Sequence, residues 1–197
     1  MPSLTGPSLT GSFIGLCWAV FLAFILASTF SAKRVAKRDR RWMFSWIGLI
    51  AFVAIFLVIG RETRLLAFLA ESVHRSLSPT VGFCADVVVF AGLAIALWGR
   101  MTLGGNWSLN PSIQEGHELV VRGPYAYVRH PMYSGLLLML LGAVIWYGSW
   151  IGAIVFVASL LGSWLKLRRE ERLLAEHFGT SYLTYKERVK ALIPFVL

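Results

Sequence analysis

The chain has very little cysteine, since only Cys17 and Cys84 occur among its 197 residues. Both lie inside long apolar segments, so neither a disulfide framework nor a zinc cluster can be built from them, and we expect no metal site. Acidic residues are also scarce, with 10 aspartates and glutamates against 19 lysines and arginines. The G-x-G-x-x-G fingerprint of a dinucleotide-binding fold is missing. A membrane reductase that uses a nicotinamide cofactor does not need this fingerprint, so its absence does not exclude one.

Apolar residues, in contrast, are abundant and grouped. They make up 57% of the chain, and the mean hydropathy is +0.67, which is too high for an ordinary soluble surface. They form long runs rather than stripes of period 2 or 3.6, as expected for helices that face lipid. The formal net charge is +9. The positive residues lie between and after the apolar runs, so membrane topology explains them better than nucleic-acid binding does.

The runs predict an all-α integral membrane protein of about five transmembrane helices. No positive segment precedes the first run, so we interpret it as a retained helix and not as a cleaved signal. An amphipathic connector is expected at residues 61–79. The last helix is expected to continue to Phe178, with Gly179 as its cap, before a short amphipathic helix at residues 181–190. The five expected spans are residues 12–30, 42–60, 80–101, 131–146 and 150–165.

The last two spans form a short hairpin. Each has about 16 residues, or roughly 24 Å at 1.5 Å per residue, against a hydrocarbon core of about 30 Å. The pair therefore either spans a thinned bilayer or is re-entrant and packed against protein. The chain is expected to form one domain, with three N-terminal transmembrane helices in residues 1–102 and a catalytic region in residues 103–197.

The distribution of positive charge predicts the topology. With five spans, 16 of the 19 lysines and arginines fall on one side of the membrane, in residues 33–41, 100–130 and 166–190. The positive-inside rule places that side in the cytoplasm, with the N-terminus outside and the C-terminus inside. The polar stretch 103–130 and the C-terminal tail therefore face the same compartment. They flank the hairpin, so a site can form between them.

Arg129 and His130 stand directly before the fourth expected helix. Pro131 suits the first position of a helix and biases His130 toward an extended backbone. The free amides of the helix N-terminus, beside Arg129 and His130, can then form an anion or carboxylate site. The alternative is an interfacial pair that reaches out to lipid headgroups.

Adjacent carboxylates at Glu170 and Glu171 face an unfavourable negative surface potential near a membrane. They are paired either with neighbouring arginines or with a cationic ligand such as a sulfonium or an α-amino group. His117 and Glu118 have no physical signature of their own and fit an ordinary loop. Asp86 is an intramembrane acid, for which pairing with an arginine of the connector is the favoured interpretation.

Together these residues resemble the isoprenylcysteine carboxyl methyltransferase family. The resemblance runs from Asn106 to Pro194 and rests on the order of its elements around an apolar hairpin. The R-H-P-x-Y element alone is less specific, because related segments occur in phospholipid N-methyltransferases and membrane sterol reductases. The compact length is similar to prokaryotic members, which implies a prokaryotic inner membrane. The matching elements are His117-Glu118-Leu119-Val120, Gly123-Pro124-Tyr125, Arg129 to Gly135, Glu170-Glu171 and Gly179 to Tyr182.

The resemblance implies a cytoplasmic pocket for S-adenosyl-L-methionine, which would leave as S-adenosyl-L-homocysteine, enclosed by the loop before the fourth helix and the C-terminal tail. Arg129, His130 and Glu170 are the implied catalytic residues. The family's substrate-binding arginine is replaced by Lys166, with Arg168 and Arg169 as alternatives. The implied cofactor-binding residues are Gln114, His117, Glu118, Leu119, Val120, Tyr125, His130, Pro131, Met132, Tyr133, Glu170 and Glu171.

The resemblance implies methyl transfer to a lipid-borne acceptor, first of all the carboxylate of an isoprenylated cysteine. Partners are then membrane lipids and a lipid or lipidated small molecule or protein. A carboxylate acceptor needs no general base, because positioning and removal of water supply the acceleration. Three alternatives stay open: a phospholipid amine N-methyltransferase, which needs a base; a membrane reductase that shares the R-H-P-x-Y segment; and a non-enzymatic scaffold or transporter.

Overall fold

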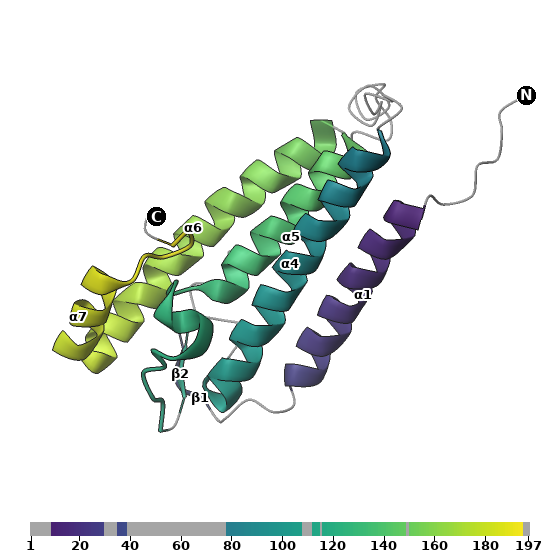
Figure 1. The fold of residues 1–197 in the computed structure, drawn as a ribbon. Coiled ribbons are helices and arrows are strands. Elements are labelled where there is room, and N and C mark those ends of the chain that lie inside the picture. Colours follow the sequence, from purple (N-terminus) through teal and green to yellow (C-terminus); the bar gives the residue numbers. More distant parts are fainter. Residues whose placement is uncertain are drawn as a thin grey trace, which may run out of the picture.

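The computed structural model describes residues 9–29, 35–38, 78–107, 112–114, 116–148 and 150–194. The second expected span, residues 42–60, and nearly all of the connector at 61–79 lie outside these residues. Within them the chain is mostly helical, as the sequence predicts (Figure 1). The helices are α1 (Leu9–Thr29), α4 (Pro79–Leu103), α5 (Pro131–Tyr147), α6 (Trp150–Phe178) and α7 (Thr180–Arg188).

The helix ends are set by local chemistry. At α4, the Ser78 side chain accepts a hydrogen bond from the backbone N–H of Val81, and a proline follows at once. This is a favourable N-cap arrangement. Helix α5 also begins at a proline, as predicted, and ends where Gly148 adopts the left-handed conformation that costs glycine no strain. Gly179 donates to the Ala175 carbonyl at 3.0 Å and ends α6, which confirms the expected cap.

Helices α4 and α5 pack closely because a stripe of small residues runs along α4. Its buried members recur every three or four residues, so they share one face of the helix. Glycines of α5 lie against this stripe, and a Cβ built at Gly92 would be 2.6 Å from the Gly135 carbonyl oxygen. Such backbone proximity is typical of helix pairs in membranes. The stripe consists of Gly82, Ala85, Val89, Gly92, Ala96 and Gly99.

Helix α1 joins the pair from the side of α4 (Figure 1). Its Ile14 and Cys17 form a buried cluster with Val89, Leu93 and Met139. At the lower end in Figure 1, the buried Arg100 donates to the Ser28 carbonyl at 3.0 Å and to the Gly104 carbonyl at 2.8 Å. A guanidinium that donates to a carbonyl in the last turn of α1 and to the carbonyl of the residue after α4 stabilises both helix ends.

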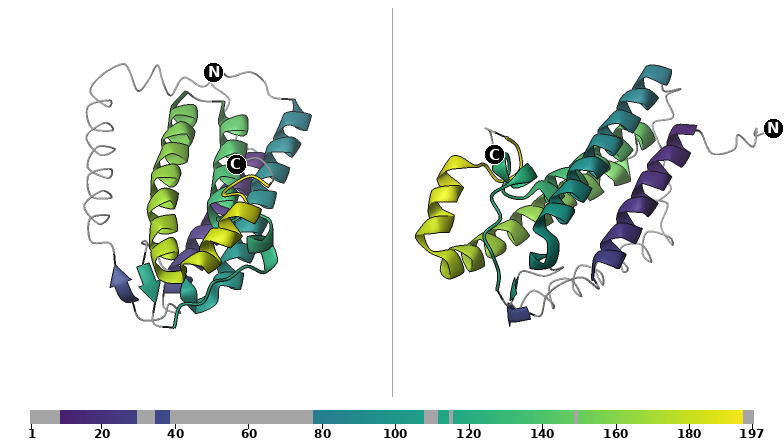
Figure 2. Two further views of the ribbon diagram at one scale, coloured as in Figure 1. Left: turned by 90° about the vertical axis from the view of Figure 1, so that its left-hand side faces the viewer. Right: turned by 60° about the horizontal axis from the view of Figure 1, so that its bottom comes forward.

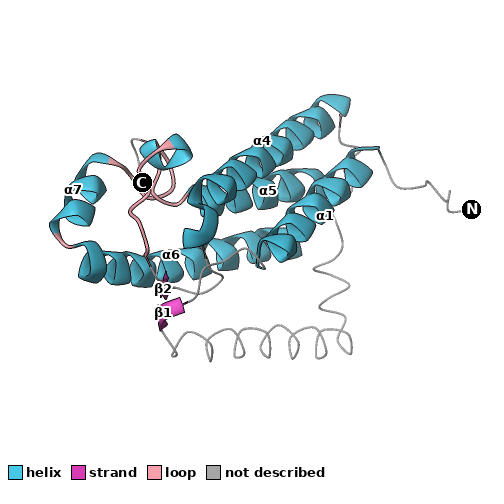
Figure 3. Cartoon of the chain, turned by 90° about the horizontal axis from the view of Figure 1, so that it is seen from below, coloured by secondary structure: helices cyan, strands magenta, loops and turns pink. Residues whose placement is uncertain are grey.

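The irregular segments gather at this same end. They comprise the 3₁₀ turns η1 (Gly104–Asn106) and η2 (Gly123–Ala126), and the antiparallel strands β1 (Val35–Arg38) and β2 (Ser112–Gln114). Figure 2 shows the strand pair at this end of the molecule. Figure 3 shows the connecting loops between α7 and α4. The prediction of an irregular 103–130 stretch is confirmed for those of its residues that the structure describes. The prediction of an all-α chain did not include this strand pair.

Two helices in the described part of the chain are long and apolar enough to cross a membrane, Leu9–Ser28 and Pro79–Asn106. Helix α5 is apolar but has only 17 residues, in agreement with the short first helix of the expected hairpin. Large apolar side chains of α6, such as Leu161 and Leu165, are exposed, as expected for a lipid-facing surface. The full number of spans and their orientation remain predictions.

Replacing Gly135 by alanine tests the α4–α5 packing. The new methyl group would collide with backbone atoms of Gly92 and Ala96, and we expect overpacking to destabilise the chain by about 1–3 kcal/mol. The measurement is thermal unfolding in detergent. Gly162→Ala is the matched control, because nothing lies within 4 Å of its added methyl group. An unchanged melting temperature for Gly135→Ala would show that the helices are not in close contact.

Candidate active site

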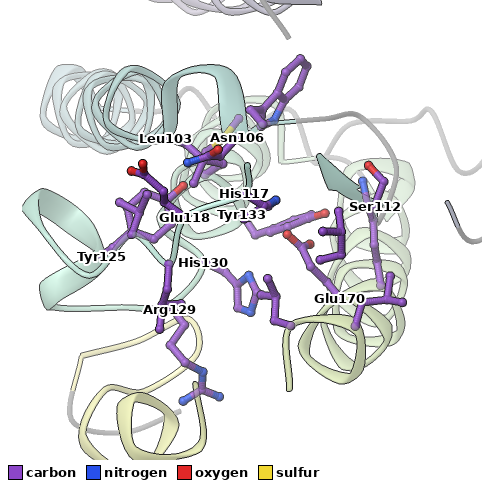
Figure 4. A pocket seen from close by; sticks show the side chains of 18 of the residues that line it. Leu103, Asn106, Ser112, His117, Glu118, Tyr125, Arg129, His130, Tyr133 and Glu170 are labelled. Atoms are coloured by element: carbon purple, nitrogen blue, oxygen red, sulfur yellow. The ribbon is translucent and has the colours of Figure 1, made fainter. Parts of the chain in front are cut away.

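A cavity of about 240 Å³ lies at the end of the bundle where the irregular segments gather. Figure 4 shows its polar side chains converging from several elements. Glu170 of α6 and Tyr133 of α5 point toward each other across the space, whereas the guanidinium of Arg129 points away from it. Leucines and aromatic rings supply the rest of the wall. A concave, mainly apolar site with a few converging polar groups is the usual form of a small-molecule pocket.

The loop before α5 forms one wall of the cavity with four consecutive residues, His117 to Val120. These four residues belong to neither a helix nor a strand. The imidazole of His117 packs edge-on against Phe178 at the end of α6, with ring centroids 5.6 Å apart. This contact fixes the start of the loop against α6.

Tyr125 lies in η2, which begins at Gly123 with a positive φ of 60°. Its backbone carbonyl accepts a hydrogen bond of 2.6 Å from the Tyr185 hydroxyl of α7. Burial raises the pKa of Tyr125 far above its ordinary value, and the charge of Glu170 raises it further. Burial raises the pKa of Tyr185 to about 12. Both phenols therefore stay protonated at any physiological pH, and the Tyr185 hydroxyl acts as a hydrogen-bond donor.

Helix α6 forms a third wall of the cavity. Its lining side chains follow one another at intervals of about one helical turn and are Lys166, Glu170, and then Leu173 and Leu174. This spacing places them on one face of the helix. The Lys166 ammonium lies 5.3 Å from the Tyr133 ring centroid, within the range of a cation–π contact. The face thus carries one cation and one carboxylate, a helical turn apart.

The C-terminal segment holds the residues that precede α5 in place. We call residues 189–192 the C-terminal strap. Backbone N–H groups of Arg129 and His130 donate to the strap carbonyls of Lys190 at 2.8 Å and Ala191 at 3.0 Å. The Ser134 hydroxyl donates to the Leu192 carbonyl at 2.6 Å. Three hydrogen bonds over six residues make the strap an added edge for the Arg129-His130 backbone.

A buried ion cluster reinforces the strap. Arg129 donates through Nη2 and Nε to Glu171 Oε1, at 2.5 and 2.9 Å, and also to the Val189 carbonyl. Lys186 Nζ lies 2.7 Å from the second oxygen of Glu171. Burial would raise the pKa of Glu171, but its interactions with His130, Lys186 and Arg129 outweigh this effect and hold that pKa far below the ordinary range.

Two polar atoms beside the cavity are buried without a close hydrogen-bond partner among the described residues, His130 Nε2 and Tyr182 Oη. His130 Nε2 lies 3.5 Å from Glu171 Oε1, which is at the long limit for a hydrogen bond. Buried polar atoms in native structures are normally satisfied. Both residues line the cavity, so a ligand is one source of the missing partner.

The structure brings most of the expected site residues together and separates the others. Pro131 is buried at the start of α5 and packs toward Gly99 of α4. Glu171 and Arg168 line a separate groove on another side of α6. Gln114 lies in β2, and its side chain falls outside what the structure describes. The expected residues that line the cavity are His117, Glu118, Leu119, Val120, Tyr125, Arg129, His130, Met132, Tyr133, Lys166 and Glu170.

Sequence reasoning missed several lining residues. Leu173 and Leu174 continue the α6 face of Lys166 and Glu170, so helical spacing could have identified them. Tyr182 and Tyr185 are three residues apart in a segment already expected to be an amphipathic helix. Phe21 and Ile25 of α1 also line the cavity, but no local signal distinguishes them from other apolar residues of a membrane helix.

Comparisons with known proteins identify relatives of this chain. The family model described as phospholipid methyltransferase matches residues 81–181, just over half of the chain. Protein-S-isoprenylcysteine O-methyltransferase B of Arabidopsis thaliana is 36% identical over 169 residues, which cover 74% of this chain and 86% of that protein. The Schizosaccharomyces pombe protein-S-isoprenylcysteine O-methyltransferase is also 36% identical, over 81 residues, but the chain spans only 34% of its length.

A solved structure has the same fold. It is a eukaryotic intramembrane Ras methyltransferase, described as an isoprenylcysteine carboxyl methyltransferase, with a TM-score of 0.60 and 19% identity, covering 98% of this chain and 70% of the other. The class is thus that of the membrane methyltransferases. Within that class, the chain belongs to the isoprenylcysteine carboxyl methyltransferase family. These relatives are eukaryotic, so the expected prokaryotic membrane remains a prediction.

Neutralising Glu171 tests the ion cluster. Because its pKa is depressed in the folded protein, its stabilisation is fully present above the unfolded value of about 4.3 and is lost only as pH falls below it. We expect Glu171→Gln to destabilise the chain at pH 7 by about 3 kcal/mol, since it leaves Arg129 buried and unpaired. The difference from wild type should shrink as pH falls below about 4.

The measurement is the unfolding midpoint of both proteins at pH 7 and near pH 3. Glu187→Gln is the control, because it removes the same charge from an exposed position of α7. A Glu171→Gln effect that matches the control, or that is equal at both pH values, would contradict the assigned role.

Proposed function

We propose that the chain transfers a methyl group from S-adenosyl-L-methionine to the terminal carboxylate of an isoprenylated cysteine. The observation that carries this proposal is the pairing of Lys166 and Glu170 on one cavity wall, beside His130 and Tyr133. These groups offer a carboxylate for a cationic donor and a cation for an anionic acceptor within one space. Membership of the methyltransferase family supports the same assignment.

The residues of the cavity fit the proposed methyl donor. A sulfonium and an α-amino group both carry positive charge, for which Glu170, Glu118 and the faces of Tyr125 and Tyr133 offer favourable surroundings. His130 Nε2 and Tyr182 Oη are available for polar atoms of the donor. Leu119, Val120 and Met132 line apolar parts of the wall. When bound, the donor supplies an electrophilic methyl group.

The remaining work of the chain is positioning and exclusion of water. A carboxylate acceptor is already nucleophilic at neutral pH, so none of the cavity residues must remove a proton. Lys166 would bind and orient the acceptor carboxylate, and Glu170 would face the positive charge of the donor. Closure of the site by the strap and the 116–130 loop would keep water out, which strengthens these electrostatic contacts.

Arg129 plays a different part from the one the resemblance implied. Its guanidinium is engaged by Glu171 and by strap carbonyls, and it points away from the cavity (Figure 4). We therefore infer that Arg129 is a positioning residue, which fixes His130 and the start of α5. Arg168, which packs on Trp164, is likewise not the acceptor ligand in this account, and Lys166 takes that role.

The domain division and topology belong to the same proposal. The cavity would face the cytoplasm, where the soluble donor is available, and the 1–102 region would anchor the catalytic 103–197 region in the membrane. A lipidated acceptor would then reach the cavity from the bilayer. A phospholipid amine acceptor is less favoured, because a protonated amine would lie beside the Lys166 cation.

Binding of S-adenosyl-L-homocysteine to the purified chain, measured by calorimetry in detergent, tests the donor pocket. We expect saturable binding by wild type and at least about tenfold weaker binding by His130→Ala and by Glu170→Ala, because each loses a hydrogen bond or charge contact. Glu187→Ala serves as the control on an exposed position. Absence of binding by folded wild type would contradict the methyltransferase proposal.

Replacement of Lys166 tests the acceptor site. We expect Lys166→Gln to raise KM for a farnesylcysteine analogue about tenfold, since a charge-assisted hydrogen bond is lost, while affinity for S-adenosyl-L-homocysteine stays within twofold. Lys166→Arg should restore most of the affinity for the acceptor, because it keeps the charge. Steady-state kinetics with calorimetry separates the two effects. An unchanged KM in Lys166→Gln would rule out this role.

A further inference from the structure

A second groove lies on another side of α6, separate from the candidate active site except at Arg129. It runs between α6 and the segment that includes Lys186 of α7 and Ala191 of the strap, and its volume is about 460 Å³. The α6 residues that line it recur every three or four positions, so they form one helix face. They are Trp164, Leu167, Arg168, Glu171, Arg172 and Ala175.

The groove is strongly cationic. Four basic side chains and one carboxylate line it. The carboxylate, Glu171, is already shared by Arg129 and Lys186. Arg168 and Arg172 are exposed, one turn apart on α6, and Arg168 packs over the Trp164 ring with 5.0 Å to its centroid. The positive charge of these two arginines is therefore not balanced by the groove's own carboxylate.

The groove begins where the apolar surface of α6 ends. Leu161 and Leu165 are 59% and 60% exposed, and every residue from Trp150 to Leu165 is uncharged. Basic residues then follow from Lys166 onward. Trp164 stands at this boundary, which is the usual depth of tryptophan at a membrane surface. A ligand in the groove would thus have lipid-facing helix on one side and water on the other.

We propose that this groove binds the phosphate of an anionic phospholipid, with its acyl chains along the exposed apolar face of α6. Arg168 and Arg172 would bind the phosphate oxygens, and the exposed part of Lys186 would add a third positive charge. The planar guanidinium suits such phosphate contacts. A membrane phospholipid fits better than free phosphate, because apolar surface for its chains continues directly from the basic residues.

The site is distinct from the proposed methyl-transfer chemistry. Lys166 and Glu170 face the candidate active site, whereas Arg168, Glu171 and Arg172 face the groove. The two sites meet at Arg129, which also donates to the backbone carbonyl of Lys186 in the groove wall. An anionic headgroup in the groove would therefore adjoin the ion cluster that holds the strap.

Native mass spectrometry of the full chain in detergent tests the proposal. Purified protein is titrated with dioleoyl phosphatidylglycerol and, separately, with dioleoyl phosphatidylcholine. We expect tighter binding of phosphatidylglycerol by wild type and a loss of roughly 30-fold in Arg168→Gln/Arg172→Gln, since each basic residue near an anionic surface contributes about a factor of five. Arg122→Gln/Arg188→Gln is the charge-matched control, at exposed positions outside the groove.

Retention of phosphatidylglycerol by the control and its loss from the groove variant would support the site. Equal affinity of wild type for the two lipids, or an equal loss in both double variants, would overturn it. A further titration with glycerol 3-phosphate distinguishes the source of the phosphate. Displacement of the lipid by this chain-free probe at comparable concentration would show a soluble phosphate ligand and would also overturn the proposal.

Discussion

The buried ion pair between Arg129 and Glu171 is the interaction on which the candidate site depends. It joins the loop before α5 to α6, and through Lys186 and the Val189 carbonyl it also joins both to the C-terminal strap. Removing one member of a buried pair costs more than the pair contributes, because the other charge is left without a partner. The pair therefore connects three segments that are distant in sequence and fixes His130 beside the cavity.

The close packing of α4 and α5 determines where the residues of this ion cluster lie. Because small residues let the two backbones approach, the start of α5 lies directly beside the end of α4. That contact places the described residues of the 103–130 segment at the end of the bundle, where Arg100 also donates to a carbonyl of α1. The polar residues are thus assembled on a rigid apolar support, as preorganised sites require.

Much of the fold follows from the sequence, because long apolar runs, prolines and glycines mark helix ends locally. The α6 and α7 boundaries could be predicted in this way, whereas the loop residues of the cavity could be predicted only from the resemblance to a known family. Glu171 could not be separated from Glu170 by sequence, since adjacent helix positions point in different directions and only the packed structure shows which way each faces. The strand pair and the contribution of Phe21 depend on long-range contacts, for which a single chain gives no local signal.

Methylation of a carboxylate on a prenylated cysteine is the reaction proposed for this cavity. The direct test incubates purified protein with methyl-labelled S-adenosyl-L-methionine and equal amounts of a farnesylcysteine analogue and phosphatidylethanolamine, then treats the products with base. We expect label in the farnesylcysteine analogue, released by base as methanol because the product is an ester. Base-stable label in the phospholipid would contradict the proposal.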